Sequence, residues 1–188
     1  MLTAREKKQL IEIAWKSIRR AVCTRTDESS EQPSVGAEGE GSLAERVGVF
    51  VTLHKKSRLR GCLGWIVSDL PLSETVNDIA GRSATEDPRF PPVTEEELTD
   101  IRVDLSILSP LKEISSIEEI QVGTHGLFIQ AGMYRGLLLP QVAVEQGWDR
   151  NRFLEETCEK AGLPSDQWKH SETRIYIFSA EIIEQETP

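Results

Sequence analysis

The most constraining feature of this sequence is an alternating hydrophobic segment that leads into a glycine-containing motif, LRGCLGW, at residues 59–65. In residues 47–53, VGVFVTL, every second side chain is valine or leucine, and this period of two predicts a β-strand with one buried face. The polar residues 54–57, HKKS, predict a turn, so the motif should return as the second strand of a hairpin. Two glycines in one strand mark a β-bulge or a place where another backbone or a ligand lies close. The hairpin is therefore the expected centre of the fold and the first candidate site.

Within this second strand, Arg60 and Cys62 are expected to share one face, because side chains alternate along a strand. Their separation along the strand would then be about 7 Å. Since a guanidinium stabilises a nearby thiolate, Cys62 is a candidate catalytic thiol. Arg60, with Gly61 and Gly64 beside it, is a candidate for binding a substrate carboxylate or phosphate in a bidentate way. The alternatives are that Cys62 only packs as a small apolar residue and that Arg60 forms an ordinary ion pair.

Residues 59–65 and three later stretches together resemble the AMMECR family, named for the Alport syndrome, mental retardation, midface hypoplasia and elliptocytosis chromosomal region. The later stretches are residues 87–92 (DPRFPP), 138–149 (LLPQVAVEQGWD) and 160–163 (KAGL). The four motifs occur in order over nearly the whole chain, and together they are more specific than any one of them. The resemblance implies a fold and a site at the first motif, without selecting a reaction.

The same resemblance adds residues and partners to the candidate site. It implies that Asp87 and Arg89, in a stiff proline-rich loop, bind substrate at a cleft, and that Lys160 does so as well. The alternatives are that the loop only covers the core and that Lys160 only balances a helix end. Similar bacterial and archaeal proteins are associated with Memo-like and radical-SAM proteins, which implies such proteins as partners in a shared modification pathway.

His125 is the candidate general base for Cys62. It lies between Gly123 and Gly126 in a turn-rich segment, where a structural hydrogen bond is the alternative role. The three histidines, His125 included, lack metal-ligand spacing, so no metal site is expected. The sequence also lacks a Walker loop, a Rossmann fingerprint and a nucleophile elbow, and no cofactor is expected.

The charge distribution argues against a broad nucleic-acid surface. The net charge is −9, but five acidic residues lie between positions 27 and 40 in a segment without lysine, and without arginine. Without those five the chain has 26 acidic and 22 basic residues, a net charge of −4. Phosphate binding over a wide surface needs clustered positive charge. Three widely spaced cysteines and the lack of any apolar run near 18 residues predict a cytoplasmic protein without a membrane span.

Periodicity along the chain predicts an α+β fold. Helical spacing covers residues 4–24, 69–84, 141–146 and 149–161, and alternating segments cover 101–107, 127–130, 135–139 and 175–180. Strands mostly in hairpins, interleaved with helices, indicate mixed, mainly antiparallel sheets flanked by helices. We expect a single domain over residues 1–188, with two lobes and a cleft. Residues 26–42, rich in Glu, Ser and Gly, are expected to form a flexible acidic insertion.

The expected function is that of an enzyme or an enzyme subunit that binds a small anionic substrate in a cleft at the LRGCLGW motif. In this interpretation it acts with the Memo-like and radical-SAM partners. The alternative is a non-catalytic adaptor that binds a protein segment in the same groove. The sequence leaves open whether the chain is an enzyme.

Overall fold

The computed structural model describes residues 2–23 and 41–185, which belong to two compact units. The first unit comprises Met1–Leu108 and Glu181–Pro188, and the second comprises Ser109–Ala180. Each unit has its own hydrophobic core. The predicted insertion at residues 26–42 lies outside the described residues except for its last two, which begin the 3-10 helix η2 (Gly41–Ala44).

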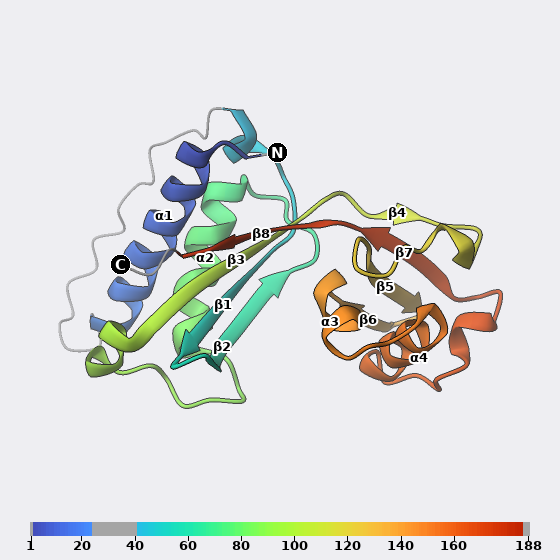
Figure 1. The fold of residues 1–188 in the computed structure, drawn as a ribbon. Helices are drawn as coiled ribbons and strands as arrows, with labels where there is room; N and C mark the ends of the chain where they lie inside the picture. Colours follow the sequence, from blue (N-terminus) through green and yellow to red (C-terminus); the bar gives the residue numbers. More distant parts are fainter. Residues whose placement is uncertain (1, 24–40, 186–188) are drawn as a thin grey trace. The chain divides into compact units, whose positions relative to one another are not determined.

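The first unit is a four-stranded sheet with two helices packed on it (Figure 1). The strand order is β2-β1-β3-β8, and β1 pairs antiparallel with both β2 and β3. Helices α1 and α2 also pack on each other, and the 3-10 helix η3 precedes β3. The elements are α1 (Ala4–Cys23), β1 (Val49–Lys55), β2 (Arg58–Trp65), α2 (Leu72–Thr85), η3 (Glu95–Asp100), β3 (Ile101–Leu108) and β8 (Ala180–Glu184).

The predicted hairpin is confirmed, with a shorter turn than expected. β1 continues to Lys55, which pairs with Arg58, so that only Lys56 and Ser57 connect the strands. Both turn residues have positive φ, 50° and 62°. Two residues of this conformation match the twist of the flanking strands, which explains why the polar residues before them stay in the strand.

Arg60 is an extra residue in the second strand of this hairpin. Leu53 pairs with Gly61 whereas His54 pairs with Leu59, so the register shifts at Arg60 and β2 contains a β-bulge. A bulge changes which face the next side chain occupies. The glycines of the motif indicated a bulge as one of two possibilities, but a period of two read along the sequence does not give its position.

The bulge separates Arg60 from Cys62, and the prediction that they share a face is wrong. β1 pairs with β3 without interruption, so Thr52 and Lys55 lie on opposite faces of the sheet. The Cys62 thiol contacts Thr52. The Arg60 guanidinium instead shares a carboxylate partner with Lys55.

The core of the first unit combines the inner faces of both helices with one face of the sheet. Helix α1 agrees with the predicted range 4–24, whereas α2 begins after Pro71, at the N-cap position, and so starts later than the predicted residue 69. The buried residues of this core include Leu10, Ala14 and Ile18 of α1, Leu72, Val76 and Ile79 of α2, and Val49, Val51, Leu53, Val103 and Leu105 of the sheet.

The two glycines of the motif lie where other atoms of the first unit come close. A Cβ atom on Gly61 would be 2.3 Å from the carbonyl oxygen of Ser83 in α2, and one on Gly64 would be 2.4 Å from the Phe50 ring. Glycine therefore lets β2 pack directly against the α2 backbone. The predicted close approach is explained by the protein's own atoms, and a role of both glycines in substrate binding stays a prediction.

The second unit is a smaller four-stranded sheet with its own helices. The strand order is β4-β7-β5-β6, and its pairs are antiparallel. Its elements are β4 (Lys112–Glu113), η4 (Ile117–Glu119), β5 (Gly126–Ala131), β6 (Tyr134–Leu138), α3 (Pro140–Glu145), α4 (Arg150–Lys160), η5 (Gln167–Lys169) and β7 (Arg174–Phe178). The predicted helix that starts at residue 149 is confirmed: Asp149 is the N-cap of α4, and its Oδ1 accepts a hydrogen bond of 2.8 Å from the Arg152 amide. Phe153, Leu154 and Cys158 of α4 are buried in its core.

The predicted last strand, residues 175–180, is two strands in different units. β7 ends at Phe178 and β8 begins at Ala180, and Ser179 separates them. The Ser179 amide donates to Ser109 Oγ at 2.9 Å, and its carbonyl accepts from the Ser109 amide at 2.9 Å. This pairing, between residues 70 apart in the sequence, interrupts the strand. The α+β class with mainly antiparallel sheets is confirmed, whereas the single-domain assignment stays a prediction.

Among the described residues, no helix is both long enough and apolar enough to cross a bilayer.

Substituting Gly61→Ala is expected to destabilise the first unit by about 1–3 kcal/mol, because the added methyl group would meet the Ser83 carbonyl oxygen in a packed layer. Urea denaturation measures the change in the free energy of unfolding. Leu59→Ala, two residues earlier on the same strand and 40% exposed, is the matched control, expected to change stability by less than about 0.5 kcal/mol. Equal stability of Gly61→Ala and the wild type would contradict this packing.

Candidate functional site

A buried carboxylate, Asp87, joins the loop after α2 to the edge strand β2. Its side chain is 2% exposed and accepts four hydrogen bonds. Oδ2 accepts from the Cys62 amide at 2.8 Å and from Arg89 Nη2 at 2.7 Å. Oδ1 accepts from the amide and the Nε of Arg89, both at 3.0 Å. These donors, the Arg89 side chain first among them, lower the pKa of Asp87 to about 2.

Arg89 is the guanidinium that lies beside Cys62. Its Nη2 donates to the Cys62 carbonyl oxygen at 3.2 Å, and its side chain is 53% exposed. The pKa of Arg89 is raised, mainly by the hydrogen bonds to Asp87 and to a smaller extent by the Cys62 side chain. The half-buried thiol itself lies 3.3 Å from Thr52 Oγ1. The expected pairing of a thiol with a guanidinium is therefore present, but its partner is Arg89 and not Arg60.

Arg60 is largely buried and fully engaged with the protein. Its Nε and Nη2 donate to the two carboxylate oxygens of Glu97 at 3.1 and 2.8 Å, and its side chain is 13% exposed. Nη1 donates to the Pro91 carbonyl at 2.9 Å, and Nη2 also donates to the Pro92 carbonyl at 3.3 Å. An anionic ligand at Arg60 would have to compete with Glu97, so the geometry favours the ion-pair alternative for this residue.

Glu97 holds both strands of the hairpin. It also accepts from Lys55 Nζ at 2.9 Å and from the Thr94 amide at 3.1 Å. The hydrogen bonds from Arg60, and then those from Lys55 and Thr94, lower the pKa of Glu97 to about 2. Thr94 and Glu97 form the capping box of η3, and the same carboxylate has two further partners, Lys55 and Arg60, that sequence reasoning missed.

Ser83 is a second residue of the site that sequence reasoning missed. Its hydroxyl donates to the Val51 carbonyl of β1 at 3.1 Å and accepts from the Leu63 amide of β2 at 3.1 Å. Ser83 is 1% exposed. Ser83 is one of three polar residues, with Ser73 and Thr75, that α2 buries among its apolar residues, and it links the helix to the hairpin.

His54 was expected in the polar turn of residues 54–57, but it lies in strand β1. Its Nδ1 lies 2.9 Å from Asp104 Oδ2, and its side chain is 29% exposed. His54 is two residues from Thr52 on the regularly paired strand β1, so it occupies the sheet face on which Thr52 contacts Cys62. Among the described residues of the first unit, it is the histidine on that face.

His125 and Lys160 belong to the second unit. His125 Nδ1 accepts a hydrogen bond from the Gln121 amide at 3.2 Å, which agrees with the structural alternative for this turn. Lys160 is exposed and is the last residue of α4, which agrees with a helix-end role. Their predicted roles with Cys62 stay predictions. Within residues 2–23 and 41–185, no cluster of three or more His, Cys, Asp and Glu side chains could hold a metal ion.

Comparison with known proteins identifies the family. A family model described as AMMECR1 matches residues 11–183. A protein of Thermococcus gammatolerans is 47% identical over 156 residues, covering 78% of this chain and 76% of that protein. A protein of Methanothermobacter thermautotrophicus is 49% identical over 148 residues, covering 76% and 77%. The crystal structure of an uncharacterized protein from Pyrococcus horikoshii is similar, with 42% identity, a TM-score of 0.82 and coverage of 95% of this chain and 91% of that chain.

This chain therefore belongs to the AMMECR1 family. The resemblance predicted from its four motifs is confirmed.

Acid is expected to destabilise the protein as the pH falls from about 4.5 towards 2. The pKa values of Asp87 and Glu97 are about 2, below their ordinary values of 3.8 and 4.5. A group whose pKa is lower in the folded state stabilises that state above its unfolded pKa, and this contribution is lost as the pH falls through the folded pKa. Each carboxylate should contribute on the order of 2 kcal/mol at pH 7.

Unfolding free energies at pH 7 and pH 3 for Asp87→Asn and Glu97→Gln test this expectation. Both variants should be less stable than the wild type at pH 7 and should lose less stability on acidification. Glu95→Gln, an exposed neighbour on η3, is the control and should keep the wild-type pH dependence. If Asp87→Asn and Glu97→Gln also keep it, these carboxylates do not cause the acid sensitivity.

Proposed function

We propose that this chain is an enzyme or an enzyme subunit that binds a small anionic substrate beside the Cys62 thiol. The observation that carries the proposal is the placement of Arg89. Its guanidinium is held by the buried Asp87, donates to the Cys62 carbonyl and is still 53% exposed. A cation with this placement can receive a carboxylate or phosphate from solvent next to a thiol.

The two arginines near the motif have different suitability for this role. Arg89 is held in position by Asp87 before a ligand arrives, so little side-chain freedom would be lost on binding. Arg60 is 13% exposed and its guanidinium already binds Glu97 and two carbonyl groups. Arg89 is therefore the proposed substrate-binding cation, and Arg60 has a structural role, because it links β2 to η3 through Glu97.

Cys62 is the proposed nucleophile for a substrate oriented by Arg89. An anion on Arg89 would bring the neighbouring atoms of the substrate close to the thiol, and proximity of this kind is a major source of rate enhancement. Two histidines are candidates for the base: His54, on the Cys62 face of the sheet, and His125 of the second unit. Gly61 contributes indirectly, because its close packing on α2 sets the position of β2.

The proposed partners come from the family resemblance. Memo-like and radical-SAM proteins would supply the radical chemistry, and this chain would contribute a substrate-binding or thiol step. Co-expression with candidate proteins of both classes, followed by affinity purification, tests the association. The tag is placed first on this chain and then on the candidate partner. Failure of both classes to co-purify in either arrangement would remove the partners from the proposal.

Binding of a small carboxylate or phosphate is expected to protect Cys62 from alkylation by iodoacetamide. A panel of acetate, succinate, citrate, phosphate and pyrophosphate serves as the probe, with modification read by mass spectrometry of peptides. Arg89→Ala should weaken the protection at least about tenfold, because a charge-assisted hydrogen-bond pair is lost. Arg89→Lys should retain part of it.

Two controls accompany this measurement. Cys158 is fully buried, and burial raises the pKa of its thiol, so it should stay unmodified in the native protein. In the variant Arg5→Ala, at an exposed position of α1, the anions should protect Cys62 as well as they do in the wild type. Equal protection in Arg89→Ala and the wild type would contradict the proposed binding role, and a Cys62 as inert as Cys158 would contradict the nucleophile. His54→Gln and His125→Gln then show which histidine affects turnover of a substrate found in this way.

An adaptor function is the second candidate, and one observation favours it. Large apolar side chains at the end of the motif and shortly after it are exposed: Trp65 at 45%, Val67 at 65% and Leu70 at 45%. Clustered exposed apolar residues are typical of a surface that binds a protein segment. The paired variants Trp65→Ala/Val67→Ser and Arg89→Ala separate the two functions. An adaptor should lose its partner in the first variant alone, whereas the enzyme proposal predicts loss of substrate protection in the second alone.

A further inference from the structure

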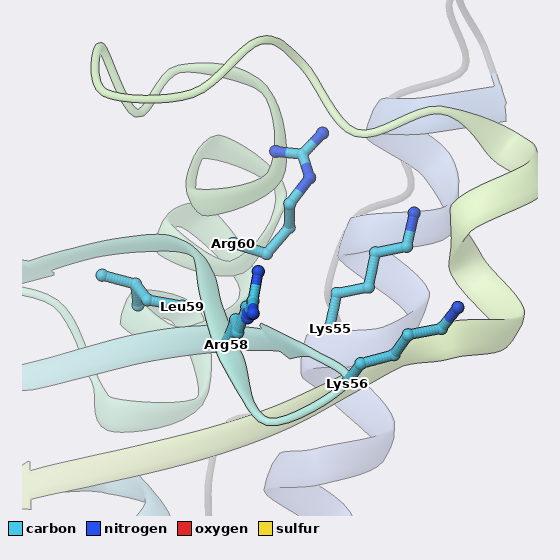
Figure 2. Close-up of a pocket in the computed structure, with 5 residues that line it drawn as sticks. All are labelled: Lys55, Lys56, Arg58, Leu59 and Arg60. Atoms are coloured by element: carbon cyan, nitrogen blue, oxygen red, sulfur yellow. The ribbon is translucent and has the colours of Figure 1, made fainter.

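Cations gather at the turn end of the hairpin, around an open pocket that the proposed reaction does not use. The pocket has a volume of about 500 Å³ and is lined by Lys55, Lys56, Arg58, Leu59 and Arg60 (Figure 2). Four of the five lining residues carry a positive charge. This is an unusual accumulation in a chain whose net charge is −9.

The positive charge of this pocket is only partly compensated. Glu97 pairs with both Lys55 and Arg60. In the part of the chain that the structure describes, no acidic side chain forms an ion pair with Lys56 or Arg58, and both are exposed. Four cations and one carboxylate leave three positive charges around the pocket.

The fold holds these charges together at a cost. Lys55 and Arg58 are directly opposite each other on β1 and β2, and like charges in such a pair destabilise a hairpin. The two-residue turn keeps Lys56 next to them with a positive φ of 50°. Figure 2 shows the side chains of Lys55 and Arg60 extending the same way from the two strands. A bound anion would relieve the repulsion. Lys55 and Arg60 also serve the fold through Glu97, whereas Lys56 and Arg58 have no ion pair among the described residues.

We infer that this pocket binds the phosphate group of a small phosphorylated compound. A phosphate monoester carries a charge between about −1.5 and −2 at pH 7, which matches the three uncompensated positive charges better than a single carboxylate does. Lysine and arginine side chains also provide apolar stems, and Leu59, which is 40% exposed, adds further apolar surface. These groups suit an apolar body attached to the phosphate. A volume of 500 Å³ fits a small ligand and is too small for a broad nucleic-acid surface.

This inference is independent of the proposed thiol chemistry. The lining residues lie at the turn, and Arg89 and Cys62 are not among them. The site could therefore serve recognition of a phosphorylated compound whether or not Cys62 reacts.

Phenyl phosphate is the probe, because it joins one phosphate to one apolar ring. Isothermal titration calorimetry at low ionic strength should show saturable binding with a Kd below about 1 mM. The variant Lys56→Gln/Arg58→Gln should weaken binding at least about tenfold, since two charge-assisted contacts are lost. Both residues are exposed and lack ion pairs among the described residues, so the variant should fold normally.

The matched control is Arg5→Gln/Lys8→Gln, which removes the same charge from exposed positions of α1. It should bind phenyl phosphate within about twofold of the wild type. Leu59→Ala should weaken phenyl phosphate but leave inorganic phosphate unchanged, and benzoate should bind at least about tenfold more weakly than phenyl phosphate.

Four outcomes would overturn the inference. They are the absence of saturable binding, an equal loss in the α1 control, benzoate binding as tightly as phenyl phosphate, and a loss in Arg89→Ala without one in Lys56→Gln/Arg58→Gln. The last outcome would place the anion at the thiol site and leave the proposed function standing. Conversely, the protection measurement at Cys62 can fail while the pocket still binds phenyl phosphate.

Discussion

The buried carboxylate of Asp87 is the interaction on which the candidate site depends. β2 is the edge strand of its sheet, so its outward amides have no neighbouring strand to bond. Asp87 accepts the hydrogen bond of the Cys62 amide on that edge and holds the Arg89 side chain with both of its oxygens. One carboxylate thus satisfies the strand edge and fixes a guanidinium beside a thiol. Its low pKa follows from the same donors.

A second carboxylate, Glu97, divides the arginines of the site into two roles. It engages Arg60 on both oxygens and leaves that side chain 13% exposed, whereas Arg89 remains 53% exposed. Residue type does not distinguish them, because both are arginines, and ion pairing does not either, because both pair with a carboxylate. Burial does, since only a solvent-accessible guanidinium can exchange water for a ligand. The turn pocket follows the same logic, because Glu97 pairs with two of its cations, whereas Lys56 and Arg58 have no ion-pair partner among the described residues.

Much of the fold and part of the site could be predicted from sequence because the responsible signals are local. The period of two in residues 47–53 predicted β1, and the polar residues between that segment and the LRGCLGW motif predicted a turn. The glycines of the motif predicted a close approach, which Gly61 makes with Ser83. The pairing of Arg60 with Cys62 failed because a bulge depends on the register with β1, which the alternation of β2 does not contain. The prediction of one strand over residues 175–180 failed for the same reason, since a hydrogen-bonded partner distant in sequence interrupts the strand at Ser179.

By itself, the sequence determined the α+β class, the hairpin, the family and the motifs that hold the candidate residues, because hydrophobic periodicity and motif order are written along the chain. Only the tertiary structure decided which charged groups meet. The Cys62 amide and Asp87 are 25 residues apart, and Arg60 and Glu97 are 37 apart. Contacts over such separations form only when α2 and η3 pack against the hairpin. The choice of Arg89 as the exposed cation is therefore a property of packing and burial, which no local pattern encodes.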